Sequence, residues 1–401
     1  MVLERKKLVW LVLFAYSAIF GQVCSLPKRN VCTPSSSRNS SIDDVPAIRE
    51  ALLTCGNGGT IVISAGETFN IRTPLDFSDC SGCDFQLEGT LKVSEDLDFW
   101  EHKIILLIQN VSNAIFHSLT DSGLIDGSGQ QYWDYFGRNK TYRRPFLIHF
   151  INASNTTFTQ VKLKNSPFWF ITINGSSTHI KLSDLVLSAV STSAYEPINT
   201  DGIDTCDCSH ITISNVHITN DDDCVCFENG SNYITVDNVT CVGARGISVG
   251  SLGWSPGLFT VKHVYVSNVK MINCTSAARI KVFPGGPSHG LVVVSNVTIQ
   301  GLTVENCGFA FRVQTCYETD ILPCKEHPST ATISDVKLID FTGQTSKEYD
   351  PAVANINCPP KGTCDLTFVG WNIVSPKKKS IVLCDHYDHP YGVTCTPGAF
   401  G

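Results

Sequence analysis

Short segments in which β-forming residues alternate with polar ones recur along the chain. HITISNVHITN, YITVDNVTCVG, VYVSNVKMIN and VVVSNVTIQG each centre on an Asn, and related segments follow one another at roughly 23 to 39 residues. Alternation with a period of two predicts strands, and recurrence at this spacing is typical of the stacked turns of a solenoid. We therefore expect an all-β fold, a right-handed parallel β-helix. A β-sandwich is the alternative.

One segment near the start of the chain has the pattern of a helix. In SSIDDVPAIREALLTCGNGG, Asp43 or Asp44 can cap a helix start, Pro46 suits the first turn and Gly56 follows the end. The apolar face would consist of Ile48, Ala51 and Leu52. We expect a short helix over residues 44–55 that covers the first coil, because an open end of a β-helix exposes strand edges. The pattern predicts little helix elsewhere.

The first residues resemble a secretory signal. Basic residues at 5–7 precede an apolar run over 8–20, and small residues before Leu26 suit cleavage. We expect a signal peptide over 1–25 and a single β-helix domain over 26–401, with a signal anchor as the alternative. The 18 cysteines also favour an oxidising, extracellular compartment. Glycosylation sequons occur at Asn39, Asn110, Asn139, Asn152, Asn155, Asn174, Asn229, Asn238, Asn273 and Asn296.

Composition narrows the class of partner. Charged residues make up only 17% of the chain, and the formal net charge is -7. An acidic chain without a basic face does not displace counterions from phosphates, so we do not expect a nucleic-acid partner. After signal cleavage we expect no membrane association, and we expect a monomer.

The unusual charged residues recur at the spacing of the coils. Asp201 is followed after about 21 residues by Asp222 and Asp223, and Arg245 comes about 22 residues later. Arg279 and Lys281 fall on the coil beyond. Because neighbouring strands lie about 4.8 Å apart, these residues would share one face. Aspartates in turns can accept backbone N–H bonds, which is our interpretation of Asp221 and an open alternative for Asp204. Stacked carboxylates repel one another, which indicates a functional role for the other three.

Four ordered motifs resemble those of the polygalacturonases, glycoside hydrolase family twenty-eight. They are NTDG from Asn199, DDC from Asp222, GARG from Gly243 and RIK from Arg279. IDGSGQQYWD and NSPFWF extend the similarity upstream, and QTCY and TSKEYDP resemble fungal exo-acting members. The resemblance covers nearly the whole mature chain and agrees with the predicted β-helix.

This resemblance implies hydrolysis of α-1,4-galacturonosyl linkages with inversion, without a metal or other cofactor. Asp222 would be the general acid, and Asp201 and Asp223 would hold and deprotonate the attacking water. The expected substrate-binding residues are Asn199, Arg245, Arg279, Lys281 and Tyr317. Three close carboxylates cannot all ionise cheaply, which suits an acid that keeps its proton. Their closeness alone would instead predict retention.

Arg245 departs from the family, which has a His at this place. Arg keeps its charge where His loses it, so Arg245 would lower the pKa of Asp222 and impair its action as an acid. Alternatively, Arg245 binds a further substrate carboxylate. The retained aspartates favour an active enzyme.

Several alternatives for the substrate and partners stay open at this point. The leading expectation is exo-acting cleavage of polygalacturonate, with rhamnogalacturonan or xylogalacturonan as enzymatic alternatives. A catalytically impaired protein that binds pectin is the alternative from another class. Such a protein would be a decoy for the plant proteins that inhibit polygalacturonases, and these inhibitors are also candidate partners of an active enzyme.

The cysteines and aromatic residues add further expectations. The resemblance implies a Cys224–Cys241 disulfide, and short spacings suggest Cys80–Cys83, Cys316–Cys324, Cys358–Cys364 and Cys384–Cys395. Cys206, Cys208 and Cys226 are expected as disulfides or buried thiols rather than metal ligands. Removal of Cys24 with the signal leaves an odd number and therefore a free or intermolecular thiol. Aromatic candidates for a sugar-binding cleft are Trp133, Trp169, Trp254 and Tyr317.

Overall fold

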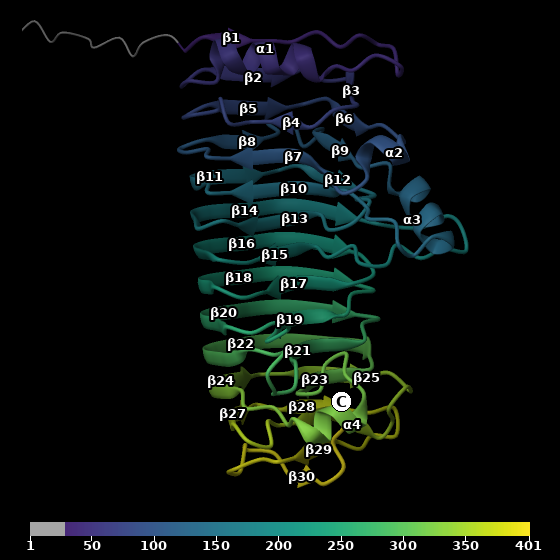
Figure 1. Cartoon of the computed structure of the whole chain (residues 1–401), viewed down its shortest axis with the longest axis vertical. Helices are drawn as coiled ribbons and strands as arrows, with labels where there is room; N and C mark the ends of the chain where they lie inside the picture. Colours follow the sequence, from purple (N-terminus) through teal and green to yellow (C-terminus); the bar gives the residue numbers. More distant parts are fainter. Residues whose placement is uncertain (1–28) are drawn as a thin grey trace, which may run out of the picture.

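The chain forms a long stack of coils (Figure 1), described by the computed structural model over residues 29–401. The predicted signal peptide and the boundary at residue 25 lie outside these residues. Strands make up 50% of the structure and helices 8%. Strands on neighbouring coils pair in parallel, as β16 (Cys208–Thr219) does with β18 (Ser231–Val242). The predicted right-handed parallel β-helix is confirmed.

Two parallel sheets run along the stack within residues 29–401. The larger sheet contains β1 (Val31–Cys32), β2 (Thr60–Ile63), β3 (Thr68–Ile71), β5 (Asp84–Leu87), β6 (Thr90–Val93), β8 (Ile115–His117), β9 (Leu124–Asp126), β11 (Ser154–Thr159), β12 (Lys162–Lys164), β14 (Ser177–Ser188), β16, β18, β20 (Leu258–Ile272), β22 (Leu291–Cys307), β24 (Thr332–Ile339), β25 (Thr342–Thr345), β27 (Thr363–Val369) and β28 (Asn372–Val374).

The second sheet carries the residues predicted for the site. It contains β4 (Leu75–Asp76), β7 (Ile104–Gln109), β10 (Phe146–Ile151), β13 (Ile171–Asn174), β15 (Ile203–Thr205), β17 (Asp223–Phe227), β19 (Gly246–Leu252), β21 (Ser276–Val282), β23 (Phe309–Gln314), β26 (Ala352–Asn357), β29 (Ile381–Asp385) and β30 (Cys395–Thr396). Each strand pairs with the next one in this order, so one coil follows another without a crossover.

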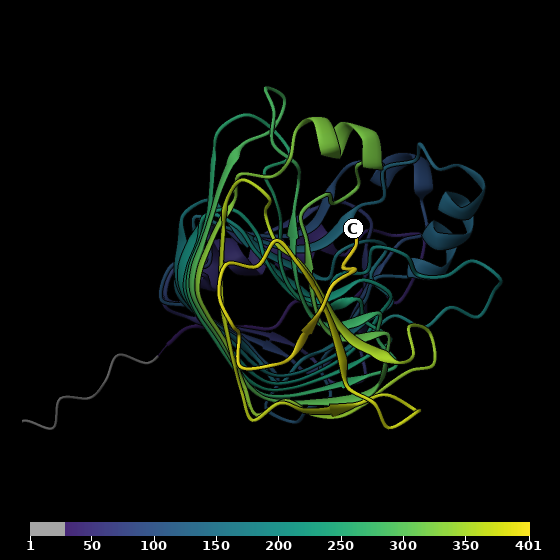
Figure 2. The same ribbon diagram turned by 90° about the horizontal axis from the view of Figure 1, so that it is seen from below.

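The predicted capping helix is present as α1 (Val45–Cys55) at the first coil (Figure 1). Asp44 occupies its N-cap position, but its carboxylate accepts hydrogen bonds of 2.7 Å from the backbone of Ser37 and of Asn70. The cap residue therefore ties the helix to the neighbouring coil. Three further helices were not predicted: α2 (Leu97–Trp100), α3 (Gly129–Arg138) and α4 (Ile321–Glu326). Figure 2 shows α3 and α4 outside the ring of strands.

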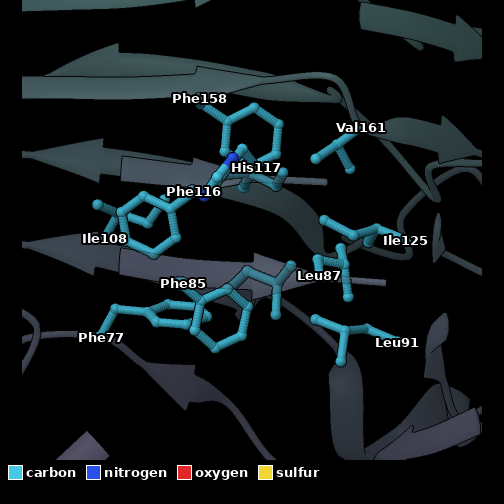
Figure 3. A pocket seen from close by; sticks show the side chains of 12 residues that line it. Phe77, Phe85, Leu87, Leu91, Ile108, Phe116, His117, Ile125, Phe158 and Val161 are labelled. Carbon is cyan, nitrogen blue, oxygen red and sulfur yellow. The ribbon is translucent and has the colours of Figure 1, made fainter. Parts of the chain in front are cut away.

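Aromatic and aliphatic side chains surround a small void in the N-terminal part of the interior (Figure 3). The Phe77 and Phe85 ring centroids lie 5.1 Å apart, edge to face, and Phe116 continues the stack at 5.8 Å from Phe85. The remaining void there is about 20 Å³ and is lined mainly by apolar side chains. It holds roughly one water, so it is a packing defect of the core rather than a ligand site.

The repeated Asn residues stack on successive coils. Asn215, Asn238 and Asn268 have φ of 55°, 54° and 54°, a left-handed conformation that Asn tolerates better than most residues. Nδ2 of Asn238 donates to Oδ1 of Asn215 at 2.9 Å. This contact explains why an Asn or Asp recurs in each segment, because the residue both turns the chain and bonds to the preceding coil.

Seven disulfides form within residues 29–401, and they include all five that the sequence predicts. Cys32–Cys55 and Cys274–Cys307 are additional. In the same part of the chain Cys206, Cys208 and Cys226 are unpaired thiols. None of the helices described between residues 29 and 401 is long and apolar enough to cross a membrane.

Candidate active site

Successive coils bring the predicted acidic residues together. Asp201 lies two residues before the start of β15, and Asp222 and Asp223 lie where β17 begins, on the neighbouring coil. Each of the three carboxyls offers an oxygen within 4.8 Å of the others. The three aspartates that were predicted to share one face therefore lie close together, and their side chains are largely buried.

Asp223 is held in the ionised form by its surroundings. Lys281 Nζ donates to Oδ2 at 2.7 Å, Ser248 Oγ donates to Oδ1 at 2.6 Å, and Arg279 Nη2 also donates to Oδ1. Burial alone would raise the pKa of Asp223, but Arg279 and Lys281 outweigh it and hold this pKa well below its usual range.

Arg279 and Lys281 are therefore already paired with a carboxylate of the protein. Their side chains are only 9% and 6% exposed, and both contact Asp223 directly. The sequence predicted them as ligands of a substrate carboxylate. In the structure they neutralise a buried carboxylate, and a substrate anion would have to share them with Asp223.

Asp222 has the opposite titration behaviour. Burial and the neighbouring charge of Asp223 raise its pKa above the usual value, while Arg245 and Arg279 oppose the shift. Its Oδ2 accepts a hydrogen bond of 3.1 Å from Asn199 Nδ2. The carboxyl thus keeps its proton to higher pH than an exposed Asp, as a general acid requires.

The pKa of Asp201 is shifted in the same direction as that of Asp222. Burial and the charges of Asp222 and Asp223 raise its pKa well above the usual value. Its Oδ1 is buried and has no hydrogen-bond partner among residues 29–401. An oxygen of this kind can bind a water or a sugar hydroxyl. The spacing of the cluster would also suit a metal ion, but Arg279 and Lys281 already supply the compensating charge.

Arg245 lies beside the acid, as the motif order predicts. Its Nε is 3.5 Å from Oδ2 of Asp222, and its side chain is 37% exposed. The guanidinium lowers the pKa of Asp222, but burial and Asp223 outweigh this effect. The predicted loss of the acid form is therefore not what these surroundings produce.

A pocket of about 740 Å³ opens beside the cluster, on the same sheet. Trp169 and Trp254 lie along its wall with Asp204 and Glu228, and Trp254 is 61% exposed. Asp204 is buried with one oxygen unpaired, so the structure does not support its interpretation as a turn residue. Burial raises the pKa of both acidic residues, with nearby carboxyls adding to the shift.

The other aromatic candidates divide between core and site. Trp133 is 1% exposed and donates its indole N–H to the Ser166 carbonyl, so it packs α3 against the coil and is not part of a cleft. Tyr317 lies by the catalytic cluster, with Lys281 Nζ 5.3 Å from its ring centre. Tyr317 is therefore in place to contact a bound sugar near Lys281.

The second sheet continues beyond the strand that carries Arg279. Arg279 is in register with Arg312 on β23, and Arg312 is in register with Asn355 on β26. The end of the chain lies across this continuation. Asn355 Nδ2 donates to the Phe400 carbonyl at 2.6 Å, and Asn357 Nδ2 donates to the Gly401 carbonyl at 2.8 Å.

Two residues of the site were missed from the sequence. Asn220 uses its amide N–H groups to bond the carbonyls of Thr200, Asp222 and Asp223 at 2.8 to 3.1 Å, which fixes the turn that carries the acids. Its place directly before the three aspartates was an available signal. Arg144 contacts Asn199, from a position 55 residues earlier in the chain, and no motif marks it.

Comparison with known proteins agrees with this geometry. Residues 55–392 match the family described as "Glycosyl hydrolases family 28". The chain is 45% identical over 378 residues to endo-xylogalacturonan hydrolase A of Aspergillus tubingensis, covering 94% of this chain and 93% of that protein. A probable endo-xylogalacturonan hydrolase A of Aspergillus flavus is 43% identical over the same length, with the same coverage.

Solved structures show the same fold. The crystal structure of the Aspergillus tubingensis endo-xylogalacturonan hydrolase superimposes with a TM-score of 0.92, covering 93% of this chain and 100% of that one, at 45% identity. The polygalacturonase of Erwinia carotovora matches with a TM-score of 0.65 at 19% identity, over 92% and 97% of the two chains, which bears on the fold alone. With its family match and these relatives, the chain belongs to glycosyl hydrolases family 28 and is a glycoside hydrolase.

Proposed function

We propose that this protein cleaves the α-1,4-galacturonosyl backbone of xylogalacturonan at internal positions. The relatives at 43 to 45% identity are named as endo-xylogalacturonan hydrolases, and this supports the xylogalacturonan alternative over exo-action on polygalacturonate. The exo preference expected from the downstream motifs has no support among these relatives.

The observation that carries the substrate proposal is the set of residues that lines the pocket beside the cluster. Asp204 and Glu228 line it without a cation paired to either side chain, while Trp169 and Trp254 supply aromatic surface. No Lys or Arg is among the residues that line this pocket, so a galacturonate carboxylate would find no cationic partner there. A neutral sugar such as xylose can instead donate its hydroxyls to these acids and pack against the rings.

The arrangement of the carboxyls supports the division of roles implied by the family. Asp222, with its raised pKa, is proposed to protonate the departing glycosidic oxygen. Asp223 stays ionised, and Asp201 offers an unpaired oxygen for the attacking water. We propose inversion at the anomeric carbon. The short separation of the carboxyls is the feature that argues for retention.

We also propose that the protein is secreted and acts outside the cell. The seven disulfides formed within residues 29–401 support this location, because such bonds persist in oxidising compartments. The substrate is a component of extracellular plant material, which requires the same location.

Hydrolysis of two matched substrates tests the proposal. Purified protein is incubated with xylogalacturonan and with the same polymer after removal of its xylose, and product sizes are followed with time. We expect faster cleavage of the xylosylated polymer and mid-length products from the start. Equal or faster cleavage of the bare backbone would contradict the substrate assignment. Release of monomer alone would contradict internal cleavage.

A further inference from the structure

A buried arginine outside the four family motifs lies next to the catalytic cluster. Arg144 lies between α3 and β10 and is 4% exposed. Its Nη1 donates to the carbonyl of Ile198 at 2.5 Å and to that of Pro167 at 3.2 Å. The first bond connects Arg144 to the segment that leads into the NTDG motif, and the second connects it to the NSPFWF segment.

The other terminal nitrogen of Arg144 determines the orientation of an amide. Nη2 donates to Oδ1 of Asn199 at 3.1 Å. A guanidinium can only donate hydrogen bonds, so the amide must turn its oxygen toward Arg144. Its Nδ2 therefore faces the other way, and it donates to Oδ2 of Asp222 at 3.1 Å. A chain of two directed bonds thus runs from Arg144 to the acid.

The surroundings keep this arginine in one place. The guanidinium carbon lies 4.0 Å from the ring centre of Phe136 and 4.8 Å from that of Phe168. Burial lowers the pKa of Arg144 to about 10, with Asp201 and Asp222 opposing the shift. Because this value lies well above mildly acidic and neutral pH, the side chain remains a charged donor whenever the enzyme works.

We propose that Arg144 is a positioning residue of the reaction, acting through Asn199 on the orientation and acidity of Asp222. This inference rests on the proposed role of Asp222 as the general acid. Without Arg144 the amide can rotate and present its oxygen to Asp222. An acceptor in that place favours the protonated carboxyl, whereas the present donor favours the ionised form.

Replacement of the guanidinium tests this role. Arg144→Met keeps much of the side-chain length and removes every donor. We expect kcat on the parent's best galacturonan substrate to fall about 10- to 100-fold, because Asp222 is less well placed. We also expect the basic limb of the kcat/KM profile to move to higher pH. Arg144→Lys can still donate to Asn199. Its kcat and the position of its basic limb should therefore lie between those of Arg144→Met and of the parent.

Two controls separate positioning from general stability. Arg138→Met removes an exposed arginine from the end of α3 and should change neither kcat nor the pH profile. In an Asn199→Ala background, Arg144→Met should no longer move the pH limb, because the amide through which it acts is gone. A purely structural role would instead lower activity at every pH without moving the limb.

A second variant keeps the test valid if Arg144→Met does not fold. Asn199→Asp leaves Arg144 with an acceptor and places a carboxylate oxygen against Asp222, so the pKa of Asp222 should rise. Titration of carboxyl carbons by NMR measures this pKa without turnover, and the Asp222 signal is identified by its loss in Asp222→Asn. A shifted pKa without hydrolysis of any galacturonan would contradict only the proposed function. An unchanged Asp222 pKa in each of these variants that folds would overturn the role of Arg144.

Discussion

The backbone N–H of Asp223 donates a 2.9 Å hydrogen bond to Oδ1 of Asp222, yet the two adjacent carboxyls titrate in opposite directions. Asp223 points at Arg279 and Lys281, while Asp222 turns toward Asn199 and Arg245. One peptide unit thus separates an ionised group from a proton-holding group. This is the division of labour that acid–base hydrolysis needs.

Asp222→Asn should abolish hydrolysis while leaving the fold intact. The amide cannot deliver a proton, and loss of a general acid typically costs about 10²- to 10⁴-fold. Reducing-sugar release from xylogalacturonan measures the effect. Asp221→Asn is the matched control in the same turn and should retain activity within a few-fold. Equal losses in both variants would show that the turn, rather than the proton of Asp222, is what matters.

Arg245→His should move the basic limb of the kcat/KM profile to higher pH. The guanidinium lowers the pKa of Asp222 across 3.5 Å, and a His that is neutral above pH 6.5 would not. Because Arg245 is partly exposed, solvent screening should keep this shift small. A pH–rate profile on xylogalacturonan measures it, with Arg245→Lys as the charge-preserving control. A variant with weaker binding and lower turnover at every pH would show that Arg245 binds the substrate instead.

Asp204→Asn should stabilise the protein above about pH 5. Burial and neighbouring acids raise the folded-state pKa of Asp204 well above its unfolded value, so the folded protein prefers the protonated form. That contribution is fully present below the unfolded pKa near 4 and is lost as pH rises through the folded pKa. Urea unfolding at several pH values measures it. Asp237→Asn, at a site where the pKa is lowered by hydrogen bonds from Ser267 and Asn268, should not stabilise.

The thiols of Cys206, Cys208 and Cys226 should react slowly in the native protein. Burial raises the pKa of Cys206 to about 11 and that of Cys208 to about 12, which keeps the reactive thiolate scarce. A chromogenic disulfide reagent at pH 8 should count three thiols only after denaturation, in a chain from which residues 1–25 have been removed. A count of one would indicate that two of these cysteines form a bond.

The anomeric configuration of the first product should be inverted. Proton NMR during the first turnovers of a xylogalacturonan oligosaccharide distinguishes the two anomers before they equilibrate. Carboxyl oxygens within 4.8 Å of one another are closer than the usual separation in inverting enzymes. A product of retained configuration would mean that the separation rule holds here and that one aspartate is a nucleophile.

The fold was predictable because each coil repeats the same local requirements. Asn215 and Asn238 turn the chain at equivalent positions, and the alternation around them sets which side chains enter the core. The spacing of Asp201, Asp222 and Asp223 then placed the acids on adjacent coils. The Asn turns and the acidic cluster were both predictable because their residues recur at the spacing of one coil.

Other parts of the site depend on contacts that no local pattern contains. The two bonds that link Arg144 to Asp222 join coils that are far apart in sequence. The engagement of Arg279 and Lys281 by Asp223 likewise depends on side-chain directions rather than on spacing. The helix α3 starts after Ser128, a preferred N-cap residue with Gln131 three positions later, and this start signal was missed; Ser128 makes no capping bond in the structure.

The position of Phe400 and Gly401 has a practical consequence for protein engineering. Because Asn355 and Asn357 hold these residues against the row that continues from Arg279, any peptide joined after Gly401 leaves from the sheet that also carries the candidate active site. An affinity tag placed there would compete with long polysaccharides for the same space. Its removal before kinetic work would then change the apparent KM for polymers more than that for short oligosaccharides.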